Sequence, residues 1–404
     1  MLAIGLLAGV AGAATTLILH AIEHVAYHYD FGTLLTGVGN SSPVRRAIAP
    51  MAGGALAAFG WWLLRRNGDV PELTPTIAEH RPIQRLRTSI DAGLQVLLVG
   101  SGASLGREGA PRQIAAALGD LATSRLSLTA RDREILLACA AGAGLGAVYS
   151  VPLGGAMFAV RIMLGGTWHP RAIGTALITS SLAVAVAYPV THFEHVLAWP
   201  DPHLSYLFVF LAVAIAPLAV AVGLVFDKLM HAARPKPQIR SWVLIPAIAF
   251  AGLVIGICSI WWPELPGNGR SILTVSLDAG LTLGGATVVL VLKPLLTALF
   301  LRTGAVGGMI TPAMATGAAA GSVLALTLNH VAGTHIEVSA LSLTCAAGVL
   351  AITQRAPAFA ALFVWELARP PEWLLIVFLV AAFTAHGIRL LRERSQAERP
   401  ETVT

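Results

Sequence analysis

Long apolar stretches alternate with short polar segments along almost the whole chain. Some stretches are long enough to cross a membrane as helices, whereas others are short or interrupted by Gly and Pro, as helices are when they end inside a membrane. The stretches lie near residues 1–20, 47–64, 91–105, 135–163, 171–189, 205–226, 241–262, 271–301, 304–329, 338–352 and 371–388. The pattern predicts an all-α polytopic membrane protein in which several helices are broken and re-entrant.

A charged pair, Arg107 and Glu108, interrupts this pattern between Gly106 and Gly109. The glycines allow a tight turn, and Pro111 suits a first helical turn but not a helix interior, so we expect a helix to start here inside the membrane. A helix N-terminus presents unpaired N–H groups and partial positive charge, which bind an anion without a cation. We expect the Glu108 carboxylate at such a site, where it can take the place of a transported anion and leave when protonated or displaced.

The two halves of the chain share short matches in the same order at an offset of about 200 residues. The matches are 67–68 with 268–269, Gly106 with Gly307, 137–142 with 343–348, and Pro152 with Pro357. Ordered matches at a near-constant offset indicate an internal repeat. Such repeats often have inverted topology and meet at a substrate site built from broken helices. The expected division is a first membrane repeat at 1–226, a basic linker at 227–240, and a second repeat at 241–404 that ends in a short basic tail.

Composition supports a membrane protein and excludes several functions. The chain of 404 residues is 56% hydrophobic and 12% charged, with a mean hydropathy of +0.73. The net charge of +6 comes from basic residues spread over short loops, which is typical of topology determinants and not of a nucleic-acid site. The sequence has no Walker motif, serine nucleophile elbow or Cys/His metal cluster, so it predicts neither an enzyme nor a resident metal or cofactor.

Three motifs together resemble the CLC family of chloride channels and chloride/proton antiporters. They are Gly-Arg-Glu-Gly at 106–109, Gly-Gly-Met-Ile-Thr-Pro at 307–312 and Tyr-Ser-Val-Pro-Leu-Gly-Gly at 149–155. The resemblance covers nearly the whole chain and is that of a short bacterial member without cytosolic CBS domains. It implies a multi-pass homodimer in the inner (plasma) membrane, with one pore per subunit and Glu108 as the gating glutamate.

The resemblance also implies which residues contact the anion. They are Gly68, Gly106, Arg107, Gly109, Tyr149, Gly307, Gly308, Met309 and Ile310, the last four through backbone N–H groups. Other interpretations of these side chains stay open at this stage. Arg107 also fits a structural anchor, Tyr149 also fits aromatic packing or an interfacial position, and Glu108 also fits a structural pair with Arg107 or Arg112.

Some positions depart from the family pattern. Gly68 stands where the family has a serine whose hydroxyl contacts the anion, so that hydroxyl is missing. Asp69 is negative, and an anion site tolerates it if it caps the following helix, turns away or pairs with Arg65 or Arg66. Ile162 stands where the best-known exchangers carry an inner glutamate, and no tyrosine follows residue 206 to close the inner side of the site. Proton coupling is therefore left open.

The main interpretation is transport of a small inorganic anion, chloride above all, through a lipid bilayer along a pathway gated by Glu108. Three alternatives remain, of which a cation transporter is the weakest, because it would need inward acids beyond Glu108, Asp69 and Asp91. The missing serine also fits a fluoride/proton antiporter of the same family. A non-transporting membrane scaffold or sensor is the alternative of another class, in which Gly68, Asp69 and Ile162 mark lost conduction.

Three further charges in or beside apolar stretches need partners. Lys293 is expected either to pair with a backbone carbonyl or an Asp, or to attract anions. Asp91 is expected at the head of the helix before the 106–109 motif, and Glu366 at the end of another helix. For both acids we expect capping or pairing with a loop.

Overall fold

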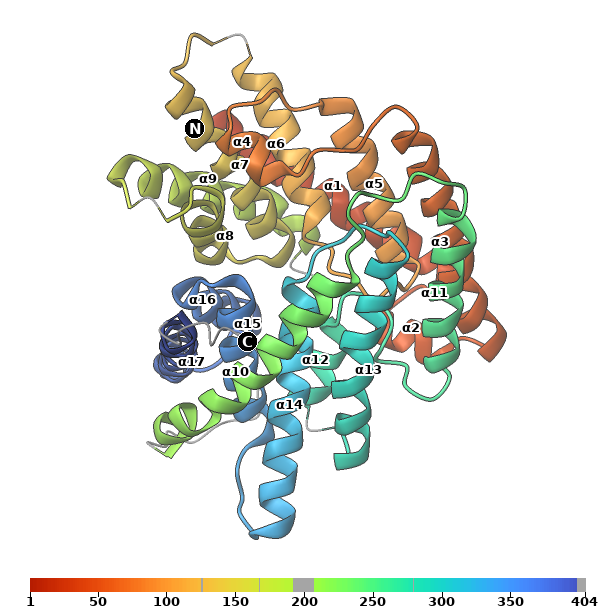
Figure 1. The fold of residues 1–404 in the computed structure, drawn as a ribbon, viewed down its shortest axis with the longest axis vertical. Helices are drawn as coiled ribbons and strands as arrows, with labels where there is room; N and C mark the ends of the chain where they lie inside the picture. Colours follow the sequence, from red (N-terminus) through yellow and green to blue (C-terminus); the bar gives the residue numbers. More distant parts are fainter. Residues whose placement is uncertain (125, 167, 192–206, 279, 398–404) are drawn as a thin grey trace, which may run out of the picture.

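A computed structural model describes residues 1–124, 126–166, 168–191, 207–278 and 280–397. Seven helices within these ranges are long and apolar enough to cross a membrane, which confirms the predicted all-α polytopic class. They are α1 (Leu2–Tyr27), α3 (Pro43–Arg65), α9 (Pro170–Thr191), α10 (Leu207–Ala233), α13 (Leu283–Arg302), α14 (Ile310–Val331) and α17 (Leu374–Ala397) (Figure 1).

The other helices are shorter or less apolar. They are α2 (Leu34–Asn40), α4 (Leu73–Ala78), α5 (Arg85–Gly100), α6 (Gly109–Thr123), α7 (Ala130–Tyr149), α8 (Pro152–Phe158), α11 (Leu244–Cys258), α12 (Arg270–Leu277), α15 (Val338–Gln354) and α16 (Pro357–Ala368), with a π-helical turn η1 at Ala159–Met163. The 15 residues of α6 and the 12 of α16 are too few to cross a bilayer, because a helix rises about 1.5 Å per residue and a hydrocarbon core is about 30 Å thick.

The core is built around α7 and α15, which are buried without interruption over 137–149 and 339–352. Both helices are rich in Ala and Gly, which lets neighbouring backbones approach closely. A Cβ on Gly142 would lie 2.4 Å from the carbonyl oxygen of Gly155, so α7 packs directly on α8. In the second half, α15 packs between α14, α10 and α17.

The two halves contain similar local structures. The C-cap residues of α7 and α15, Ser150 and Arg355, are both left-handed, with φ of 55° and 53°. Each is followed by a short helix that begins at a proline, Pro152 in α8 and Pro357 in α16. These two short helices contact each other in the middle of the molecule, where the yellow-green and blue parts of the ribbon meet (Figure 1).

The basic linker expected at 227–240 differs from the structure at its start. The α10 helix continues to Ala233, so the connection to α11 is limited to 234–243. Moreover, α10 packs against α13, α14, α15 and α17, all of which belong to the second half. An apolar pattern cannot reveal this boundary, because α10 stays helical past the point where its sequence becomes charged.

Candidate functional site

The starts of α6 and α14 lie side by side. Gly106 and Gly308 form an antiparallel bridge in which each N–H donates to the carbonyl of the other, at 2.7 and 2.8 Å. Directly after the bridge, α6 begins at Gly109 and α14 at Ile310. The structure therefore brings together the two broken-helix starts that the sequence pairs.

The bridge changes the role that two of the predicted contacts can have. The N–H groups of Gly106 and Gly308 donate to each other's carbonyls in this structure, so the N–H contact expected at Gly308 stays a prediction that would require this bridge to open. The N–H groups of Gly307, Met309 and Ile310 make no hydrogen bond within the described part of the chain. These three remain open to a ligand.

Glu108 is fully buried between the two helix starts, with 0% of its surface exposed. Its Oε1 accepts hydrogen bonds from the backbone N–H and the hydroxyl of Thr311, at 2.6 and 2.8 Å. Its Oε2 has no hydrogen-bond partner among the described residues and lies where a Cβ on Gly106 or Gly308 would be, 1.8 Å from either ideal position. The two glycines thus make the space that the carboxylate occupies.

The carboxylate of Glu108 is held by helix donors and not by a cation. No ion pair joins it to Arg107 or Arg112 in the described ranges. Arg107 turns away: its guanidinium carbon lies 4.9 Å from the centre of the Tyr149 ring, and Nη2 is 3.4 Å from the carbonyl of Val148. This placement corresponds to the anchor interpretation of Arg107.

Tyr149 is buried at the end of α7 and is not interfacial. Its ring packs edge-on against Phe363, and its hydroxyl contacts the side chain of Thr311 and accepts a long hydrogen bond of 3.5 Å from Asn268. Sequence reasoning did not single out Thr311 or Asn268. Both had a signal, because Thr311 lies in the 307–312 motif and Asn268 belongs to a matched pair of the repeat.

A cavity of about 650 Å³ reaches this region from the side of the 234–243 connection. Its walls include Gly109, Arg112 and Gly307, the loop 69–74, and residues 234–238. Gly68 lies next to that loop in a left-handed conformation (φ 115°), and its carbonyl accepts from Arg87 at 2.5 Å. The cavity thus connects the loop after Gly68 with both helix starts.

The expected roles of Asp69 are wrong in part. The N-cap of α4 is Glu72, so Asp69 does not cap that helix. The predicted partner Arg65 donates instead to the carbonyls of Ile239 and Gly304. Asp69 Oδ1 accepts from Arg240 Nε at 3.0 Å, and this hydrogen bond lowers the pKa of Asp69. Its charge is compensated by a residue far along the chain, which local patterns cannot reveal.

Asp91 does not head a helix, because α5 begins six residues earlier at Arg85. It is buried and accepts hydrogen bonds from Trp61 Nε1 (2.8 Å), Gln95 Nε2 (2.8 Å) and Gln113 Nε2 (2.9 Å). The side chain of Gln95 packs on Gly109, where a Cβ would lie 2.1 Å from Oε1. This network joins α3, α5 and α6 beside the start of α6.

Lys293 and Glu366 both bind backbone groups. The Lys293 ammonium donates to the carbonyls of Leu265 (3.0 Å) and Gly267 (2.7 Å), which confirms the carbonyl pairing expected for a buried lysine. Glu366, near the end of α16, accepts from the N–H groups of Leu153 (2.9 Å) and Gly154 (2.6 Å). It therefore caps α8 of the other half, which agrees with the expected capping role.

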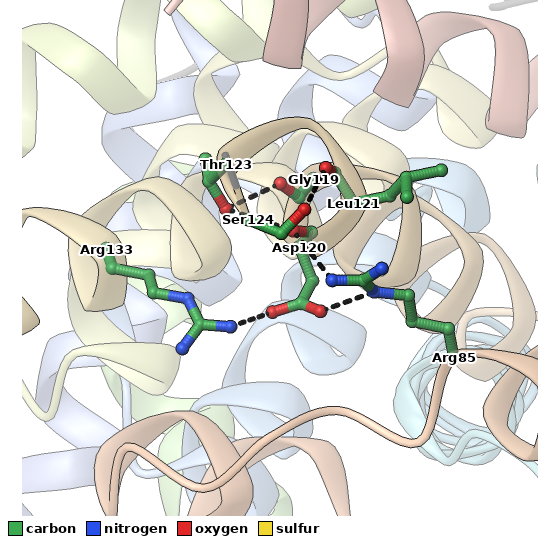
Figure 2. A network of polar contacts seen from close by, with 7 residues as sticks. All are labelled: Arg85, Gly119, Asp120, Leu121, Thr123, Ser124 and Arg133. Carbon is green, nitrogen blue, oxygen red and sulfur yellow. Dashed lines mark hydrogen bonds and ion pairs between the residues drawn. The ribbon is translucent and has the colours of Figure 1, made fainter. Parts of the chain in front are cut away.

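The far end of α6 is fixed by a buried carboxylate between two arginines. Asp120 binds Arg85 through Oδ2, 2.6 Å from Nε, and Arg133 through Oδ1 (Figure 2). A negative charge near a helix C-terminus is unfavourable, so these arginines compensate it. They also tie α6 to the starts of α5 and α7. The cluster thus holds the end of α6 that lies opposite Glu108.

Comparison with known proteins agrees with this geometry. The family described as voltage gated chloride channel matches residues 53–389. A ClcB-like chloride channel protein of Ralstonia nicotianae is 29% identical over 96% of this chain and 94% of its own length. The structure of a slow cyanobacterial Cl⁻/H⁺ antiporter superposes with a TM-score of 0.80 at 20% identity, covering 98% and 97% of the two chains. A CLC-type fluoride/proton antiporter gives a TM-score of 0.68 at 18% identity, covering 96% and 93%.

Proposed function

This chain belongs to the voltage gated chloride channel family, and we propose that it carries small inorganic anions, chloride above all, through a pathway gated by Glu108. Members of this family are transport proteins and not enzymes. The observation that carries the proposal is the position of the Glu108 carboxylate at the start of α14, on the N–H and hydroxyl of Thr311. Donors that bind a carboxylate at a helix N-terminus also suit a halide.

The gate opens when the carboxylate leaves these donors. Protonation turns one carboxyl oxygen into an O–H donor and removes the charge that strengthens both hydrogen bonds. The unpaired Oε2 makes the closed state less favourable, because a buried oxygen without a donor costs free energy. An arriving anion therefore competes with a carboxylate of which only one oxygen, Oε1, is hydrogen-bonded.

The other residues of the site fall into two groups, those that can bind the anion directly and those that shape or support the site. The open N–H groups of Gly307, Met309 and Ile310 support direct anion binding, and the start of α6 at Gly109 supplies a second set of donors. Gly106 and Gly308 lack side chains and so leave room for the Glu108 carboxylate. Tyr149 acts indirectly, by holding the Thr311 side chain that binds Glu108. Arg107 in turn holds Tyr149 through its contacts with the Tyr149 ring and the carbonyl of Val148.

Proton coupling through the inner glutamate position is not supported. Ile162 lies in the π-helical turn η1 beside Arg161, and neither residue can exchange a proton at neutral pH. We include in the proposal a homodimer in a bacterial plasma membrane, for which the bacterial relative and the apolar residues exposed on α17 are the support.

The test is anion flux from liposomes that contain the purified protein, with simultaneous pH recording under a chloride gradient. Chloride efflux above that of protein-free liposomes is expected. Fluoride efflux in place of chloride efflux would indicate the fluoride/proton antiporter. A folded protein that moves neither anion would refute transport and favour a scaffold or sensor.

A further inference from the structure

Arg112 is a cation in the wall of the cavity, one turn into α6. Its Nε donates to the backbone carbonyl of Glu108 at 3.0 Å, and its guanidinium carbon lies 5.0 Å from the centre of the Phe158 ring. These two contacts fix the plane of the guanidinium. They also attach it to the residue that carries the proposed gate.

The terminal nitrogens of Arg112 are open to the cavity. A guanidinium has five N–H donors, and in the described part of the chain only the one on Nε has a partner. The terminal nitrogens are not enclosed, because the side chain is half-buried and lines the cavity. The Glu108 carboxylate does not use them, since it is bound to Thr311.

Neighbouring acids do not use these donors either. Asp69 pairs with Arg240, and Asp91 accepts from three other side chains. Glu72 lines the same cavity and makes no ion pair with Arg112 within the described ranges. Arg65, a buried arginine of the same wall, donates from its terminal nitrogens to the carbonyls of Ile239 and Gly304. Arg112 therefore has hydrogen-bonding capacity that the protein itself does not fill.

We propose that the cavity contains an anion-binding subsite in which the guanidinium of Arg112 and the start of α6 bind a small monovalent anion next to the gate. Arg112 would supply the polar side-chain contact that is missing at Gly68. The inference rests on the proposed function and deepens it by naming a residue that sets anion affinity. A guanidinium is weakly hydrated and presents parallel N–H groups, so it can replace part of the hydration shell of an anion.

Chloride titration by calorimetry tests the subsite, with the full-length protein in detergent. Arg112→Gln removes the charge and keeps a polar side chain, and we expect its chloride Kd to rise about tenfold. Arg112→Lys keeps the charge and should recover part of the affinity. Arg131→Gln is the matched control, because Arg131 is exposed and, among the residues that the structure describes, its ion pair is with its neighbour Glu134. An unchanged Kd in Arg112→Gln would overturn the subsite.

The outcomes separate this inference from the proposed function. If the wild-type protein moves no anion in liposomes, the proposed function fails. If it moves chloride but Arg112→Gln binds chloride like the wild type, only the subsite fails. Should Arg112→Gln not fold, the wild-type protein crystallised with bromide decides the question. Anomalous density at the Arg112 guanidinium supports the subsite, and bromide bound near Met309 without any at Arg112 refutes it.

Discussion

Thr311 binds one oxygen of Glu108 with two donors, its backbone N–H and its hydroxyl, although 203 residues separate the two in the chain. The first half carries the acid and the second half carries the donors. In the proposed mechanism this contact between the halves closes the anion path, and two charge-assisted hydrogen bonds on Oε1 stabilise it while the unpaired Oε2 opposes it.

Glu108→Gln should open the gate. The amide keeps the shape of the carboxyl group but lacks its charge, so its hydrogen bonds with Thr311 are weaker by roughly 1 kcal/mol. We expect chloride efflux from liposomes to rise severalfold and to lose most of its dependence on pH. Glu79→Gln, at an acid whose side chain is 59% exposed, is the control. An unchanged rate with an unchanged pH dependence would contradict the gate.

Gly308→Ala should force the carboxylate out without touching its charge. The added Cβ would lie 1.8 Å from Oε2 of Glu108, so the closed position becomes sterically impossible. Efflux should rise as it does in Glu108→Gln, and the double variant should not exceed either single one, because both remove the same contact. Gly174→Ala is the control, since nothing lies within 4 Å of its Cβ position. Additive effects in the double variant would exclude this explanation.

Asp120→Asn should destabilise the protein. The substitution leaves Arg85 and Arg133 facing a neutral amide, and because both arginines are about one-third exposed, the loss is expected at roughly 1–3 kcal/mol. Thermal unfolding in detergent measures it. Glu79→Gln breaks a solvent-exposed pair with Arg81 and should have little effect. Equal melting temperatures for Asp120→Asn and the wild type would show that the cluster does not hold α6.

Asp69→Asn should free Arg240 and speed tryptic cleavage after it. The pKa of Asp69 lies below its usual value of about 3.9. Its ion pair is therefore complete above that value and is lost only as pH falls through the lowered pKa. The ratio of cleavage rates between variant and wild type should be the same at pH values near 6 and near 8. A ratio that changes across this range would indicate that another group controls the connection.

Much of the site followed from glycine and proline positions. Helix starts inside a membrane require residues that turn the backbone. The segments 106–111 and 307–312 contain such residues, glycines followed by a proline, and they can be recognised in the sequence. What could not be predicted were contacts between distant residues, such as Asp69 with Arg240, and the use of two glycine N–H groups in the bridge. Asp91 was misplaced because the first turns of α5 are polar and extend beyond the apolar stretch.

Helix packing favours a different division into repeats from the one expected from the sequence. We propose a boundary between α9 and α10. Within the described residues, the main packing partners of α10 are α13, α14, α15 and α17, all in the second half. With that boundary, α1 and α10 each open a half. The sequence pattern alone favoured a division at 226, where the apolar stretch ends.

The cluster at Asp120 has a consequence for biosynthesis. Its partners lie only 35 and 13 residues away, so every residue of the cluster is synthesised before the second half of the chain. Thr311 is synthesised much later. During that interval the Glu108 carboxylate has no donor from Thr311, and a bare charge in an apolar interior is costly, so we expect the nascent first half to keep Glu108 in contact with water until the second half inserts.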